Sequence, residues 1–178
     1  EDGGMPTLPV GRSGRSAHQV AEETVREAGR LIMRWFDAPA GSAGAPAISH
    51  KGRADIVTEA DTAVEAAALA MLREEFPDFG VLAEESGAAP GSGPYTWVLD
   101  PIDGTRNFAN GVPHFAVNLA LVKSRDGVPG PTYDPVLGLT YDPVRNELFH
   151  AEAGQGAFLN GERISVSSTE SLEMSVLG

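Results

Sequence analysis

The chain has 178 residues, of which 42% are hydrophobic and none is cysteine. That length and composition predict one globular domain with a sizeable core. Thirteen basic against 25 acidic residues give a formal charge of −12, which argues against nucleic acid as a partner. No apolar run is long enough to span a membrane, and the lack of thiols fits a reducing compartment. We therefore expect a soluble cytoplasmic protein without a membrane partner.

The first fifteen residues contain glycine and proline without helical periodicity or caps, so residues 1–15 are predicted to be a disordered leader. From Ser16 the pattern changes. Ser16 and Gln19 form a capping box, and apolar residues recur at helical spacing as far as Phe36. This pattern predicts a first helix. Its aromatic end, Trp35 and Phe36, is expected to pack in the core rather than to hold a ligand.

A second helix is predicted after the D-I-V-T motif of residues 55–58, beginning between its threonine and Asp61 and ending at Pro77. Between the two helices, residues 38–47 are Ala, Gly, Pro and Ser, which predicts a mobile loop. Lys51 follows that loop. It is either a solvated lysine or a binding residue, and the sequence leaves both interpretations open.

The rest of the chain reads as strands separated by turn residues. Residues 115–122 form an apolar run that predicts a strand buried on both faces. Short strands are then expected around residues 137–141, 147–153, 157–159, 164–166 and 174–177. Two N-terminal helices layered on this antiparallel sheet give an α+β fold.

One stretch, W-V-L-D-P-I-D-G-T-R-N-F at residues 97–108, carries the strongest chemical signal. An apolar run that stops at Asp, Pro, Asp and Gly predicts a buried strand with Asp100 and Asp103 at its carboxyl end. The proline restricts the backbone and the glycine permits a positive φ, so the two carboxylates can converge on one point. Hard divalent cations prefer such oxygens.

A lone D-P-x-D-G can also be an ordinary turn. The context favours a site, because residues 81–86, V-L-A-E-E-S, are a second apolar run that ends in the carboxylates Glu84 and Glu85. Thr105 adds a hydroxyl, and Gly104 and Thr105 add backbone N–H groups. Together these groups predict a metal and phosphate site.

These motifs resemble the inositol monophosphatase family of magnesium-dependent, lithium-sensitive sugar phosphatases. The resemblance rests on D-P-I-D-G-T-x-N-F, the Glu-Glu-Ser element, the D-x-V-T-x-x-D element ending at Asp61, and G-Q-G-A-F-L-N-G at residues 154–161. It implies that residues 16–178 are the N-terminal α+β metal-binding domain, the first half of an αβαβα sandwich. The family's second α/β domain, with a last metal-binding aspartate, is expected to be missing from this chain.

The resemblance also implies roles for individual residues. Mg²⁺ would be bound by Glu84, Asp100, Asp103 and the backbone carbonyl of Ile102; Asp103, Gly104 and Thr105 would contact the substrate; and Glu84, Thr105 and Asp61 would be catalytic. Asp61 would orient Thr105, although an acid in the first helical turn is also favoured by the helix dipole. Glu85 is either an outer ligand or only a neighbour of the ligands.

The expected reaction is hydrolysis of a small phosphorylated metabolite by metal-activated water, with inositol monophosphate as the first candidate substrate and a homodimer as the expected assembly. Fructose 1,6-bisphosphate, histidinol phosphate and 3′-phosphoadenosine nucleotides are alternatives, because the fold does not choose among them. A rival hypothesis is a non-catalytic metal-binding or interaction fragment. It is motivated by the absence of any W-D-x-A type motif from the sequence.

Overall fold

The computed structural model describes residues 7–38, 48–50, 56–125 and 132–175. Its helices are α1 (Ala17–Phe36), α2 (Glu59–Glu75) and the short α3 (Thr105–Ala109), followed near the end by a 3-10 turn at Leu172–Met174. Its strands are β1 (Ile48–His50), β2 (Ile56–Thr58), β3 (Gly80–Ala83), β4 (Gly87–Ala89), β5 (Tyr95–Asp103), β6 (Ala116–Ser124), β7 (Tyr133–Asp142), β8 (Glu147–Glu152), β9 (Gly156–Leu159) and β10 (Glu162–Ile164).

Within the described residues, eight strands form one sheet in the order β10-β9-β8-β7-β6-β5-β3-β4, and β1 pairs with β2 separately. The neighbouring strands are antiparallel except β3 and β5, which run parallel. A parallel pair needs a longer connection than a hairpin, and here β4 and its flanking turns supply it. The sheet is therefore mixed, which confirms the expected α+β class and adds one parallel pair to the expected antiparallel order.

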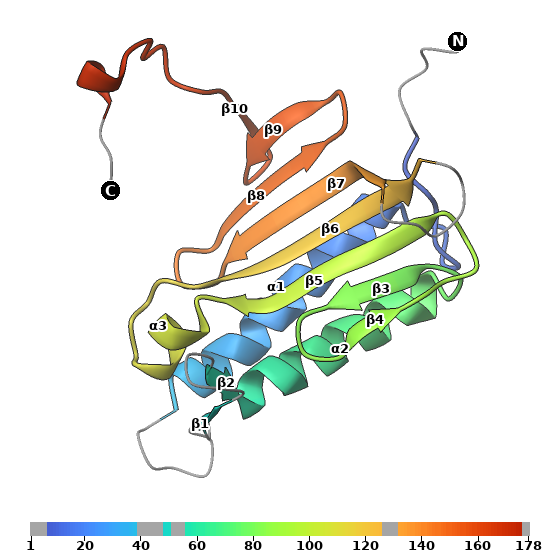
Figure 1. Cartoon of the computed structure of the whole chain (residues 1–178), viewed down its shortest axis with the longest axis horizontal. Coiled ribbons are helices and arrows are strands. Elements are labelled where there is room, and N and C mark those ends of the chain that lie inside the picture. The colour runs from blue at the N-terminus through green and yellow to red at the C-terminus, as the bar shows by residue number, and fades with distance from the viewer. Residues whose placement is uncertain (1–6, 39–47, 51–55, 126–131, 176–178) are drawn as a thin grey trace.

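Helices α1 and α2 lie side by side on one face of the sheet (Figure 1). The predicted capping box of α1 is confirmed, because the Ser16 side chain accepts from Gln19 N–H and the Gln19 side chain accepts from Ser16 N–H. Trp35 and Phe36 pack against the core, as expected. On the sheet, the core is built from alternate residues such as Trp97, Leu99, Leu119, Leu121 and Leu139.

Strand β6 departs from the expectation that both of its faces are buried. Val117, Leu119 and Leu121 are buried, whereas Asn118 and Ala120 between them are only half-buried. The reason is the placement of the helices: α1 and α2 cover one face, and in the described part of the chain the other face carries no helix (Figure 1). We call this second surface the open face of the sheet.

Part of the predicted leader is ordered. Residues 1–6 lie outside the described residues, but residues 7–15 are tied to the domain, since Val10 bridges Ser16 and Arg12 N–H donates to the carbonyl of Glu75. The Glu75 side chain accepts from Ser13 and from Arg15. The prediction of disorder is therefore wrong for residues 7–15. Its order comes from tertiary contacts with α2, which local periodicity does not report.

Two strands expected late in the chain also differ. A strand was expected at residues 164–166. The strand in the structure is β10, Glu162–Ile164, so the two ranges share only Ile164. Met174 ends the 3-10 turn rather than beginning a strand, and residues 176–178 lie outside the described residues. Among the described helices, none is long and apolar enough to cross a membrane.

Candidate active site

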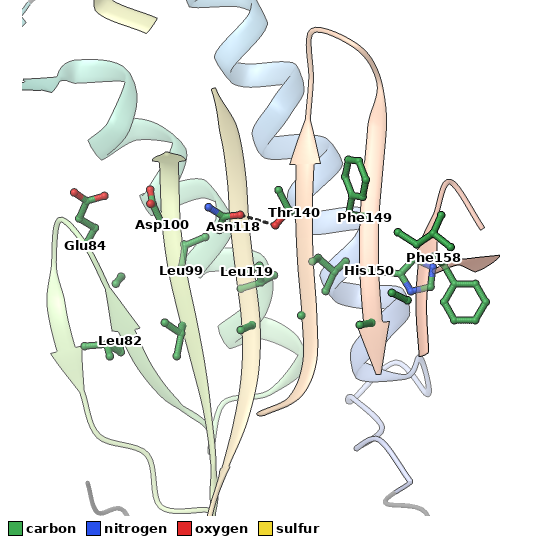
Figure 2. Close-up of a pocket in the computed structure, with 18 residues that line it drawn as sticks. Leu82, Glu84, Leu99, Asp100, Asn118, Leu119, Thr140, Phe149, His150 and Phe158 are labelled. Atoms are coloured by element: carbon green, nitrogen blue, oxygen red, sulfur yellow. Dashed lines mark hydrogen bonds between the residues drawn. The ribbon is translucent and has the colours of Figure 1, made fainter. Parts of the chain in front are cut away.

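The site is assembled where β3 and β5 end. These two strands are parallel neighbours, with Ala83 opposite Leu99, so their carboxyl ends meet at one edge. Glu84 is the first residue after β3, and its N–H donates to the carbonyl of Leu99. Asp100 follows Leu99 on β5. Figure 2 shows the carboxylates of Glu84 and Asp100 at the same end of the sheet.

Asp100 has a perturbed carboxyl group. Its pKa is raised from the ordinary value to about 7, first by burial, then by the charge of Glu84 and a hydrogen bond to it, and then by Asp103. Its Oδ1 atom is buried without a hydrogen-bond partner. Crowded carboxylates with an unsatisfied buried oxygen are electrostatically unfavourable unless a proton or a cation joins them.

The second half of the site is a sharp turn. The register of β5 against β6 shifts between Asp100 and Asp103, so Asp103 is exposed beyond the regular ladder. Gly104 then adopts a φ of 93° at the N-cap of α3. A Cβ at this position would lie 2.9 Å from the carbonyl oxygen of His114. Both the backbone conformation and the lack of space therefore require glycine here.

Thr105 and Asp61 lie within contact distance. Thr105 Oγ1 is 3.2 Å from Asp61 Oδ1 and 2.9 Å from the carbonyl oxygen of Ile102. A threonine hydroxyl has one proton, so it donates to only one of these acceptors at a time. Asp61 is 1% exposed in the first turn of α2. The arrangement expected for Asp61 and Thr105 is thus present, although their catalytic roles remain predictions.

Two residues of the site were not identified from the sequence. Glu65, 3% exposed on α2, accepts from the N–H groups of Glu85 at 2.7 Å and Ser86 at 2.8 Å, and so it holds the turn that carries Glu84. Its spacing of four residues from Asp61 was the available signal, because it places both acids on one helical face. Asn118 on β6 donates from Nδ2 to Asp103 Oδ2 at 2.9 Å. No local pattern indicated that contact.

The donor set fits a hard divalent cation. Among the described residues, no three histidine, cysteine, aspartate or glutamate side chains already form a compact metal-binding group. The fit rests instead on the unpartnered Asp100 oxygen, the contact between Glu84 and Asp100, and the presence of Asp103 nearby. The Ile102 carbonyl adds a backbone oxygen. Mg²⁺ accepts a few such oxygens and completes its shell with water. Lys51 lies outside the described residues.

The chain belongs to the inositol monophosphatase family. The family model matches residues 15–178, more than half of the chain. This finding confirms the family that the motifs resembled and agrees with the mixed sheet under two helices.

Curated relatives carry two kinds of name. An inositol-1-monophosphatase of Caulobacter vibrioides is 40% identical over 87% of this chain and 57% of its own length. A Nus factor SuhB of Pseudomonas aeruginosa is 40% identical over 89% of this chain and 55% of its own length. This chain thus spans little more than half the length of these relatives.

Solved structures agree with the fold. The extragenic suppressor protein suhB from Bartonella henselae has a TM-score of 0.73 at 36% identity, over 85% of this chain and 54% of that one. An IMPase from Thermotoga maritima has a TM-score of 0.72 at 36% identity, over 88% of this chain and 55% of that one.

Proposed function

We propose that the protein is a Mg²⁺-dependent phosphomonoesterase that hydrolyses a small phosphorylated metabolite, with inositol monophosphate as the first candidate. One observation carries this proposal: Asp100 has a buried, unpartnered oxygen beside Glu84 and Asp103, so the site has charge and oxygen donors to offer a cation. Family membership supports the reaction class. The names of the relatives support the candidate substrate.

In this proposal Glu84, Asp100, Asp103 and the Ile102 carbonyl hold the metal. Mg²⁺ bound there would neutralise charge on the phosphate and would lower the pKa of a water nucleophile. Glu84, which is exposed just after β3, would accept a proton from the water nucleophile. Thr105, held beside Asp61, orients the water through its hydroxyl.

The turn after Asp103 binds the phosphate in this proposal. Gly104 and Thr105 present backbone N–H groups, and the positive φ of Gly104 lets the chain reverse there without a clash. Backbone N–H groups in such a turn suit phosphate oxygens, where negative charge accumulates during transfer.

The test is phosphate release from a panel of esters by the longest natural form of this polypeptide. Inositol monophosphate, fructose 1,6-bisphosphate, histidinol phosphate and a 3′-phosphoadenosine nucleotide form the panel. We expect hydrolysis that requires Mg²⁺ and is inhibited by Li⁺. Absence of Mg²⁺-dependent release from every ester would contradict the proposal.

The variant Asp103→Asn gives the sharpest version of this test. An amide keeps the shape of the side chain but loses the charge that holds Mg²⁺, so we expect turnover to fall by at least about a hundredfold. Folding should change little, because the side chain is exposed at the end of β5. Asp134→Asn, which alters an exposed aspartate paired with Arg125, is the matched control and should retain full turnover.

A second candidate function is a non-catalytic interaction role. It is favoured by the name Nus factor SuhB on several relatives, including the Escherichia coli protein. An interaction role predicts that Asp103→Asn leaves the biological activity intact in cells, whereas a phosphatase role predicts its loss.

The cytoplasmic location and the homodimer also stay proposals, and light scattering of the longest natural form tests the dimer.

A further inference from the structure

The open face of the sheet carries a polar row next to the candidate active site. Asn118 on β6 lies opposite Asp100 on β5 and opposite Thr140 on β7. Thr140 Oγ1 donates to Asn118 Oδ1 at 2.7 Å, and Asn118 Nδ2 donates to Asp103 Oδ2 at 2.9 Å. Figure 2 shows the contact between Thr140 and Asn118 beside Asp100 and Glu84. Three strands thus join in one hydrogen-bonded chain that ends on Asp103.

The direction of this chain follows from charge. An ionised carboxylate only accepts hydrogen bonds, so the NH₂ group of Asn118 must face Asp103. The carbonyl oxygen of Asn118 then faces Thr140, whose hydroxyl must donate. The Thr140 hydroxyl, opposite Asn118 on β7, thereby fixes the orientation of the Asn118 amide. Among the described residues, Thr140 is thus linked to Asp103 through Asn118.

The consequence concerns the free oxygen of Asp103. Its Oδ2 is occupied by Asn118, which leaves Oδ1 for another partner. Asp103 is exposed and lies beyond the break in the β5 register, so packing does little to restrict its side chain. The hydrogen bond from Asn118 supplies that restriction. Neighbours that orient a ligand in this way commonly affect metal affinity strongly.

We propose that Asn118 and Thr140 are positioning residues that orient Asp103 for a divalent cation. This inference rests on the proposed function, because it assumes that Asp103 is a ligand. It goes beyond that function by assigning a task to two residues of the open face, neither of which belongs to the D-P-I-D-G-T motif.

The test is Mn²⁺ affinity of the longest natural form, measured from the free-ion electron paramagnetic resonance signal with Mg²⁺ as competitor. Thr140→Val removes the hydroxyl with little change in shape and should weaken binding by about tenfold. Thr140→Ser restores the hydroxyl and should bring binding back toward the wild-type value. Thr96→Val, the same change on β5 four residues before Asp100, is the control and should have no effect. Thermal unfolding in EDTA shows that each variant folds.

A double-mutant cycle separates positioning from a general structural effect. If Thr140 acts only through Asn118, Thr140→Val has no further effect in an Asn118→Ala background. Wild-type Mn²⁺ affinity in Thr140→Val, failure of Thr140→Ser to restore binding, or additive losses in the cycle would each overturn the inference. Mn²⁺ binding that behaves as expected without hydrolysis of any phosphate ester would overturn the proposed function but support the positioning role. A wild-type protein that binds no Mn²⁺ would overturn both.

Discussion

Gly104 is the residue whose backbone most directly shapes the candidate site. Its φ of 93° is unfavourable for any residue that has a side chain. An added Cβ would also lie only 2.9 Å from the His114 carbonyl oxygen. We expect Gly104→Ala to lower the free energy of unfolding by about 1–3 kcal/mol, because the alanine must adopt a strained backbone or displace residues near His114. Urea unfolding, followed by tryptophan fluorescence, measures the change.

Gly138 offers a matched control for that experiment. It lies on β7, and a Cβ added there has open space around it. The same Gly→Ala change at this position should leave stability unchanged or raise it slightly, because alanine restricts the unfolded chain. Equal losses at the two positions would mean that the turn at Gly104 carries no special strain.

Single residues of the site differ in how visible they were in the sequence. Asp100 and Asp103 were predicted because a buried strand ending in D-P-I-D-G is a local pattern. Asp61 and Thr105 were paired only through the family resemblance, since 44 positions separate them. Asn118 was missed because its contact with Asp103 depends on the register of β5 against β6 and on the break within it. Periodicity within one strand contains no information about that register.

At the scale of elements, α2 has an unusual buried face. It carries three carboxylates, those of Asp61, Glu65 and Glu75, which are 1%, 3% and 8% exposed. Each accepts hydrogen bonds from a different segment: Asp61 from Thr105, Glu65 from the turn after β3, and Glu75 from residues 13–15. Buried carboxylates are tolerated only with such partners. Helix α2 thus fixes two segments of the site and the N-terminal segment in one place.

Glu65 should control the turn that presents Glu84. In Glu65→Gln one of the two accepting oxygens becomes an NH₂ group, so one of the N–H groups of Glu85 and Ser86 loses its acceptor. We expect a loss of about 1–3 kcal/mol in unfolding free energy. Faster hydrogen exchange at these two amides would locate the loss. Glu74→Gln, an exposed change on the same helix, is the control.

Glu75 gives the fold a defined pH dependence. Its pKa is lowered to about 2, first by the Ser13 N–H group and then by the Arg15 and Ser13 side chains. A carboxyl with a lowered pKa in the fold stabilises it fully above the ordinary value of 4.5, and this stabilisation is lost as the pH falls from 4.5 toward 2.

The measurement compares wild type with Glu75→Gln. We expect the wild type to be the more stable protein above pH 4.5 and the difference to shrink as the pH falls through that window. Urea unfolding at several pH values gives both curves. Parallel curves for the two proteins would show that Glu75 is not held by Ser13 and Arg15.

For the whole molecule, the sequence predicted which elements form the layers better than it predicted the direction of the strands and the burial of their two faces. Two helices and a run of strands were recognised by their periods, and α1 and α2 do lie against the sheet as expected. The parallel pairing of β3 with β5 was missed, because strand direction depends on the path of the connection rather than on the strand residues. Likewise, the apolar run at β6 predicted burial on both faces, yet Ala120 and Asn118 face the open side.

The open face leads to a prediction for the 178-residue chain taken by itself. Apolar side chains line a shallow hollow of about 810 Å³ there, among them Leu82, Phe149 and Ile164, which are 46%, 37% and 38% exposed. Contiguous exposed apolar surface favours association, because joining two such faces removes both from water. We therefore expect the isolated chain to self-associate, with an apparent mass in light scattering that rises with concentration.

Leu82→Lys should reduce that rise, since a charge at the face must be desolvated on association. Val144→Lys, at a 36% exposed position in the turn after β7, is the matched control and should associate like the wild type. A monomeric mass for the wild-type chain at every concentration tested would show that the open face is stable in water without a partner.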